Sequence, residues 1–183
     1  MRISEKQNSE YTLLVRIILW AQKKKYGESL MPTKIWGRSP KLVYGLQALY
    51  RAIDRKSSPL EPDLRALINV KVSQINHCDF CVDISSSLLQ KQGISLKKIE
   101  QLEGYHTSEL FSAKEKTALQ YAEVVTKYDQ KVNAELFSQL RQFFSDDEIV
   151  ELTGLIAYQN LSSKFNAALD IPTQGFCIKK CDK

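Results

Sequence analysis

The chain has 183 residues, of which 43% are hydrophobic and 26% are charged, and its formal net charge is +5. These values are typical of a globular protein and exclude a disordered or fibrous one. The length suits a single domain with a substantial hydrophobic core. Four cysteines are too few for a disulfide-built scaffold, and no signal peptide precedes them. We therefore expect a cytoplasmic protein.

The N-terminal third holds the most apolar run and most of the basic excess. Residues 11–21 are mainly apolar, but Arg16 lies in their middle and the run is short of the roughly twenty residues that span a membrane. We expect an amphipathic helix and no membrane association. The lysines at 23–25 fall at the end of this helix, where cations complement the helix dipole. Because no nucleic-acid-binding module accompanies them, we expect no nucleic-acid partner.

Helical signals begin with a helix over 9–25, followed by Gly27. A proline-bracketed, irregular connection that holds Trp36 is expected next. Residues 40–56 then favour a second helix. Its apolar stripe is expected at Leu42, Leu46, Leu49 and Ile53.

Residues 62–75 are ambiguous between helix and strand. Their apolar residues recur at helical spacing, but Ile68, Val70 and Val72 also alternate as they would in a strand. We favour a helix, because no other run offers a strand partner and a lone strand could not satisfy its backbone hydrogen bonds.

The second half of the chain adds further helices. A short one is expected over 95–102, and capping boxes at Ser112 and Ser145 indicate helices that run to about 127 and 169. Asn133 can cap another helix through 143. The total is seven or eight helices and no sheet, so we predict an all-α, single-domain protein.

Two cysteines, Cys78 and Cys81, lie three residues apart at an expected helix start. We expect Asn76 to be the N-cap and Asp79 to be the third helical residue, near the positive end of the dipole. Neighbouring thiols at this spacing can form a disulfide, and the free N–H groups of the first turn stabilise a thiolate. For an isolated CxxC motif, a redox pair, a zinc site and inert packing all remain open.

The run from Leu64 to Gly93, with Asn-His-Cys-Asp-Phe-Cys-Val-Asp at its centre, resembles the carboxymuconolactone decarboxylase superfamily, in the branch typified by alkylhydroperoxidase D. Segments that begin at Phe111, Phe144 and Gln159 resemble later helices of that family. The resemblance implies an alkylhydroperoxidase D-like helical bundle that assembles as a trimer or hexamer. It divides the chain into an N-terminal helical extension (1–58), a family core (59–176) and a tail (177–183).

The resemblance also implies roles for the two thiols. Cys81 would attack a peroxide as a thiolate, and Cys78 would resolve the resulting sulfenic acid into a disulfide. A dithiol or protein reductant would then reopen the disulfide. Because Cys78 is nearer the helix end, we expect it to be the more exposed and more acidic thiol.

The chain departs from the family at the proton relay. The family's Glu, twelve residues before the first cysteine, is Ala66, and its His, four residues after the second, is Ser85. Losing a base and an acid should weaken peroxide chemistry. His77 is the best candidate base, with an exposed residue of no function as the alternative. Ser85 can hydrogen-bond a thiolate but cannot take its proton, and we expect Asp83 to face solvent.

A second cysteine pair, Cys177 and Cys181, lies in the tail, and we expect an accessory thiol pair or no role there rather than a shared zinc site. We therefore predict a thiol–disulfide oxidoreductase, an antioxidant protein similar to alkyl hydroperoxide reductases, without metal or cofactor. Its substrate would be a peroxide or a disulfide. The alternatives are a non-enzymatic oligomeric module for binding or redox sensing, and a lactone decarboxylase on the same fold.

Overall fold

The computed structural model describes residues 1–177, which form nine α-helices, a 3₁₀ turn at Asn8–Glu10 and no strand. The helices are α1 (Leu13–Tyr26), α2 (Met31–Trp36), α3 (Pro40–Ile53), α4 (Pro62–Ile75), α5 (Asp79–Lys91), α6 (Leu96–Glu100), α7 (Ala113–Thr126), α8 (Ala134–Arg141) and α9 (Asp146–Ala168). The all-α prediction is confirmed. The count exceeds the expected seven or eight because of α2.

Helix α2 replaces the irregular connection that was expected around Trp36. Pro32 lies in its first turn, where a missing N–H costs nothing because no intrahelical partner exists for it. The Trp36 ring stacks on Phe165 of α9, with ring centroids 3.6 Å apart. The proline therefore starts a helix that tertiary packing holds in place, rather than breaking one.

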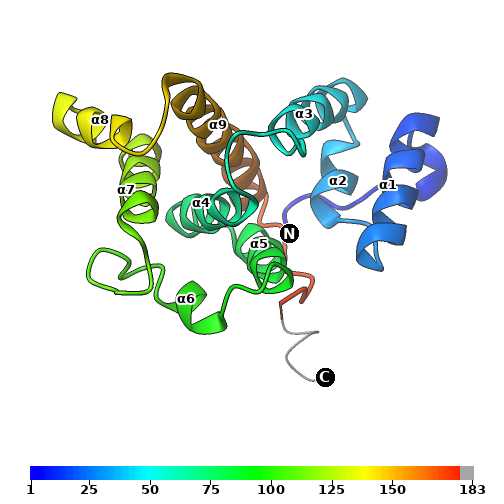
Figure 1. Cartoon of the computed structure of the whole chain (residues 1–183). Coiled ribbons are helices and arrows are strands. Elements are labelled where there is room, and N and C mark those ends of the chain that lie inside the picture. Colours follow the sequence, from blue (N-terminus) through cyan, green and yellow to red (C-terminus); the bar gives the residue numbers. More distant parts are fainter. Residues whose placement is uncertain (178–183) are drawn as a thin grey trace.

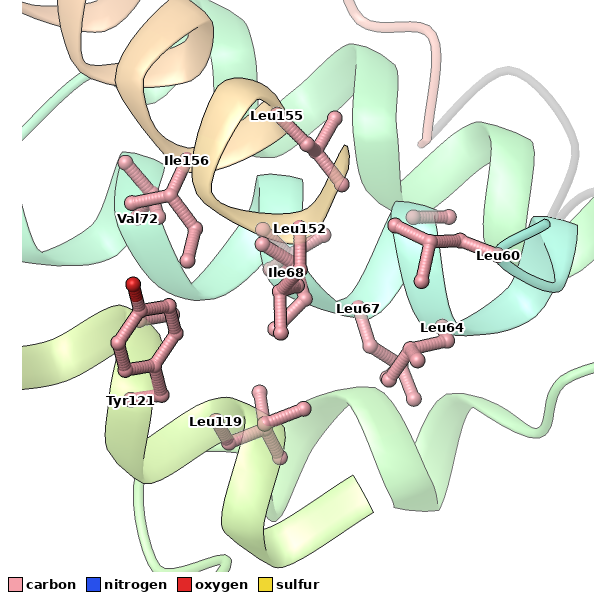
Figure 2. Packing of buried hydrophobic residues seen from close by; sticks show 14 of the residues in the cluster. Leu60, Leu64, Leu67, Ile68, Val72, Leu119, Tyr121, Leu152, Leu155 and Ile156 are labelled. Carbon is pink, nitrogen blue, oxygen red and sulfur yellow. The ribbon is translucent and has the colours of Figure 1, made fainter. Parts of the chain in front are cut away.

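Helix α4 lies in the middle of the array and packs against α5, α7 and α9 (Figure 1). Leu67, Ile68, Val70 and Val72 are fully buried, so apolar residues occupy more than one face of this helix. This explains its strand-like alternation, and the helix prediction is confirmed. Figure 2 shows the α4 side chains between those of α9 on one side and those of α7 on the other.

The N-terminal helices α1, α2 and α3 lie on one side of α4, and α7 and α8 lie on the other (Figure 1). The N-terminal part of the chain has an apolar cluster of its own, made by Tyr11, Val15, Leu19, Trp36 and Val43. The stripe expected on α3 is partly wrong: Leu42 and Leu49 are exposed, whereas Val43 is fully buried. Within the described residues, no helix has the length and apolarity needed to cross a membrane.

Candidate active site

Three residues, Asn76, His77 and Cys78, connect α4 to α5. The His77 N–H donates to the Gln74 carbonyl at 3.1 Å, and the Cys78 N–H donates to the Ser73 carbonyl at 3.0 Å. His77 itself has a φ of 53°, in the left-handed region. These features together are a Schellman motif, which ends α4 and sets Cys78 at the start of the next helix.

Cys78, rather than Asn76, is the N-cap of α5. Its sulfur accepts a hydrogen bond from the Cys81 N–H at 3.3 Å, as a serine or aspartate oxygen does at other helix starts. The expectation for Asn76 is wrong because this residue ends α4 and its amide donates to side chains of α9. Asp79 is the first helical residue rather than the third, and it still lies at the positive end of the dipole.

The two thiols of the CxxC motif meet in the first turn of α5. Their Cα atoms are 5.3 Å apart and their sulfur atoms are at disulfide-bonding distance. When the pair is reduced, the free N–H groups of this turn and the helix dipole favour a thiolate over a thiol. The arrangement can therefore cycle between a dithiol and a disulfide.

Both cysteines are buried, with exposed fractions of 2% for Cys78 and 4% for Cys81. The expectation that Cys78 would be the more exposed thiol is therefore wrong. Cys78 shares an apolar cluster with Ile171 and Phe176 of the C-terminal segment. The ring of Phe176 also packs edge-on against Phe80, which lies between the cysteines, with ring centroids 6.2 Å apart. The C-terminal segment thus covers the CxxC motif.

Asp83 fixes this covering segment to α5. Its carboxylate accepts backbone N–H groups from Gln174 at 3.2 Å, Phe176 at 3.0 Å and Cys177 at 2.8 Å. The residue is buried, so the expectation that it would face solvent is wrong. Burial of a carboxylate is costly unless donors of this kind replace water.

Asn166 of α9 is the polar neighbour of Cys81. Its side-chain amide donates to the Cys81 sulfur at 3.2 Å, and the residue is only 2% exposed. A neutral donor stabilises a thiolate but cannot take up its proton. In the sequence, Asn166 is the last residue of the segment beginning at Gln159, which resembles a later helix of the family. Its role was missed because this contact joins residues 85 positions apart.

A cavity of about 340 Å³ adjoins Cys81. Residues of the N-terminal helices α1, α2 and α3 line it together with residues of α4, α5 and α9. Ala66 and Ser85, which occupy the relay positions named by the resemblance, also line the cavity, whereas Cys78 and His77 do not. The structure thus brings Cys81 and Ser85 together at the cavity and leaves His77 outside it.

His77 is exposed and serves the α4–α5 turn through its backbone. A role for its side chain as a base remains a prediction. Residues 1–177 contain no cluster of three His, Cys, Asp or Glu side chains placed to hold a metal ion. Cys177 accepts a hydrogen bond from the Gln90 amide at 3.4 Å, and Cys181 lies outside the described residues.

Comparison with known proteins identifies relatives of the chain. A model of the carboxymuconolactone decarboxylase family matches residues 40–124. The protein YnjA of Escherichia coli (strain K12), which is uncharacterized, is 38% identical over 92% of this chain and 93% of its own length.

Two solved structures share the fold. A peroxidase-related protein from Ralstonia eutropha JMP134 with an alkylhydroperoxidase AhpD core has a TM-score of 0.87 at 20% identity, covering 97% of this chain and 94% of its own. The debrominase Bmp8 has a TM-score of 0.82 at 19% identity, covering 97% of this chain and 95% of its own. A variant of Bmp8 has been solved with 2,3,4-tribromopyrrole bound. These two structures confirm the alkylhydroperoxidase D-like fold.

Proposed function

This chain is a member of the carboxymuconolactone decarboxylase family, and on that basis we propose that it is a thiol–disulfide oxidoreductase that reduces a peroxide through Cys78 and Cys81. One observation carries the proposal: the two sulfurs are at bonding distance at the N-terminus of α5, and Cys81 borders a cavity that can admit a substrate. A disulfide substrate would use the same pair.

The proposed reaction has two chemical steps. The Cys81 thiolate attacks one peroxide oxygen, the O–O bond breaks, and the products are a Cys81 sulfenic acid and an alkoxide that takes a proton to become an alcohol. The Cys78 thiol then attacks the Cys81 sulfur, a disulfide forms, and water leaves. A dithiol or protein reductant restores both thiols by thiol–disulfide exchange.

Thiolate formation rests on hydrogen bonds rather than on a neighbouring base. The dipole at the N-terminus of α5 and the Asn166 amide both favour the anionic form of Cys81, whereas the first-turn N–H of Cys81 bonds to the Cys78 sulfur. Ala66 and Ser85 offer neither a base for the thiol nor an acid for the departing alkoxide. We therefore expect solvent to supply and accept these protons, with slower turnover than a built-in relay would give.

Regeneration requires access to a covered disulfide. Cys78 is 2% exposed and shares an apolar cluster with Ile171 and Phe176, so a reductant reaches this sulfur only after neighbouring residues move, or else attacks Cys81 from the cavity. Our proposal includes a cytoplasmic location, where small dithiols and reducing proteins are available.

Dehalogenation is a second candidate, because Bmp8 shares the fold and the cavity beside Cys81 is large enough for a small ring compound. In that reaction the dithiol would become a disulfide while a carbon–bromine bond is replaced by a carbon–hydrogen bond and bromide leaves. Release of bromide from 2,3,4-tribromopyrrole in the presence of dithiothreitol would favour this candidate over peroxide reduction.

The test of the proposed function is turnover of cumene hydroperoxide with dithiothreitol as the reductant. We expect the wild type to turn over, Cys78→Ser and Cys81→Ser to lose turnover, and the control Cys177→Ser to retain it. If the thiols oxidise without turnover, the protein is a redox-sensing module. If they do not oxidise, the peroxidase proposal is wrong, and binding or lactone decarboxylation takes its place.

A further inference from the structure

The cavity beside Cys81 extends well beyond the thiol. Asn166 lines it next to Cys81, and Tyr158, eight residues earlier on the same helix, also lines it. At 1.5 Å per residue, these positions are about 12 Å apart along α9. A volume of about 340 Å³ is in the range of sites for small organic molecules. Hydrogen peroxide would fill only a small part of it, since one water occupies roughly 30 Å³ in the liquid.

Charges on the cavity wall are predominantly positive. Three cations, Lys25, Arg51 and Arg65, line the cavity together with a single carboxylate, that of Asp54. The Arg65 Nη1 donates to one oxygen of Asp54 at 3.0 Å. One cation is therefore balanced and two are in excess. We use the name cationic end for these four residues together with Tyr50 and Tyr158, which also line the cavity; Lys25, Arg51 and Asp54 are exposed.

The two tyrosines add hydroxyl donors to the cationic end. Tyr50 donates to the second oxygen of Asp54 at 2.8 Å, so each carboxylate oxygen already accepts a hydrogen bond. The Tyr158 hydroxyl has no hydrogen-bond partner among the described residues. Burial, and then the charge of Asp54, raise the pKa of both tyrosines above the ordinary value, so both hydroxyls stay protonated. This end thus offers donors and cations to a ligand.

Buried polar atoms without partners are concentrated on the cavity wall. Among the described residues they include Trp36 Nε1, Arg65 Nε, Asn69 Oδ1 and Asn166 Oδ1, and all four residues line the cavity. Trp36 and Asn166 are only 6% and 2% exposed. Such atoms are costly to bury unless a bound molecule pairs with them. Between them the wall is apolar, with Leu46, Ile84 and Leu155 among its residues.

We propose that the cavity binds the hydroperoxide of an apolar carboxylic acid, with the carboxylate at the cationic end and the hydroperoxide at Cys81. This inference rests on the proposed peroxidase function and names its substrate class. The thiolate sulfur takes the distal oxygen, the O–O bond breaks, and the hydroxy acid leaves after its alkoxide gains a proton. The carboxylate is unchanged by the reaction and serves only for recognition.

Recognition of the acid draws partly on residues outside the family match. Lys25 of α1 and Trp36 of α2 precede the matched residues 40–124, and both line the cavity. The thiol pair lies inside the matched region and supplies the reaction. Helix α1 therefore adds Lys25 to a cationic end whose other charged residues, Arg51, Asp54 and Arg65, lie within the matched region.

The first test compares linoleic acid hydroperoxide with its methyl ester, using dithiothreitol as the reductant. A charge-assisted hydrogen bond supports a kcat/KM about tenfold higher for the acid than for the ester. In Lys25→Gln/Arg51→Gln this ratio should fall close to one. The matched control, Lys23→Gln/Lys24→Gln, changes lysines of the same helix that do not line the cavity and should keep the wild-type ratio. Equal values for acid and ester in the wild type would overturn the proposal.

A second test measures binding without redox chemistry. We expect Cys78→Ser/Cys81→Ser to bind decanoate about tenfold more tightly than decanamide by isothermal titration calorimetry. If decanoate binds in this way but no hydroperoxide is reduced, the peroxidase function is wrong and the acid-binding site stands. If cumene hydroperoxide is reduced but decanoate has no advantage over decanamide, the substrate class alone is wrong.

Discussion

At the scale of single residues, Cys81 depends on two neutral sources of stabilisation for its thiolate. One is the helix dipole at the N-terminus of α5, and the other is the amide of Asn166, 3.2 Å from the sulfur. Neither can remove the thiol proton, so the pH of the solution sets how much thiolate is present. A change in either source should therefore alter the pH dependence of turnover as well as its maximum.

The Asn166 amide can be tested by replacing it with alanine. We expect Asn166→Ala to lower the rate of Cys81 alkylation by iodoacetamide at pH 7 about tenfold, because a hydrogen bond to the charged sulfur is lost. The pH of half-maximal alkylation should rise. The measurement uses a Cys78→Ser/Cys177→Ser background, with mass spectrometry to confirm the labelled residue. An unchanged pH profile would contradict the role assigned to Asn166.

His77 has a backbone role in the structure, and its side chain does not line the cavity. Asparagine also tolerates the left-handed conformation but cannot act as a base near neutral pH. We therefore expect His77→Asn to retain peroxide turnover within about twofold, since the turn is preserved. A fall of tenfold or more between pH 6 and 8, with stability unchanged, would show instead that the imidazole is the base.

The sequence pointed to some of these residues and not to others, for a physical reason. Cys78 and Cys81 were found because their chemistry depends on a spacing of three residues along one helix. The role of Asn166 was missed, and Asp83 was wrongly expected to face solvent, because their partners lie 85 or more residues away in the chain. Local patterns carry no information about which distant segments fold against one another.

At the scale of helices, features set by the local sequence were again predicted, whereas features set by distant contacts were not. Asn133, Ser112 and Ser145 were predicted as caps, and each accepts the expected hydrogen bond from an N–H three residues later. These interactions are local. Helix α2 was missed because it is held by stacking on α9, and the cap of α5 was misplaced because a Schellman motif shifts the chain there by two residues.

Helices α4 and α7 are joined by an ion pair at the edge of the core. Lys71 is 7% exposed, and its ammonium group lies 3.7 Å from a carboxylate oxygen of Glu123. Burial lowers the pKa of Lys71, against the opposing charge of Glu123. Burial alone would raise the pKa of Glu123, but a hydrogen bond from Lys127 and the charge of Lys71 lower it below the ordinary value.

Replacing Glu123 should leave a buried cation without its partner. We expect Glu123→Gln to lower the free energy of unfolding by about 2 kcal/mol, less than for a fully buried pair because Glu123 is partly hydrated. Its lowered pKa means that the contribution is complete above the unfolded value of about 4.3 and is lost as the pH falls further. Urea unfolding at pH 7 and pH 3 should show the difference shrinking in acid. Glu109→Gln, at an exposed site, is the control, and an equal loss there would contradict the account.

At the scale of the whole molecule, helix α1 presents a largely exposed apolar surface, on which the Lys24 ammonium lies 4.0 Å from the centroid of the Trp20 ring. Leu13, Ile17 and Trp20 are 70%, 49% and 58% exposed, and their spacing places them on one face of the helix. Contiguous exposed apolar surface of this kind marks an interaction site. We propose that it joins copies of this chain into the trimer or hexamer that the family resemblance implies.

Assembly through α1 can be tested with charges on that face. We expect Leu13→Glu/Ile17→Glu to convert the oligomer to a monomer, because the burial of two carboxylates at an interface is costly. Size-exclusion chromatography with light scattering gives the mass directly. Val150→Glu changes an exposed apolar residue of α9 and should leave the mass unchanged. A monomeric wild type, or an oligomer that survives both changes on α1, would contradict the proposal.

The most direct test of the redox account is to identify the first sulfur that a hydroperoxide oxidises. Cys78→Ser, which retains Cys81 and lacks the resolving thiol, is mixed with one equivalent of cumene hydroperoxide and a sulfenic-acid probe such as dimedone, and the labelled residue is identified by mass spectrometry. We expect the label on Cys81, with one alcohol formed for each protein chain. A label confined to Cys177 or Cys181, or no label despite peroxide in contact with the protein, would contradict the assignment of Cys81 as the attacking thiol.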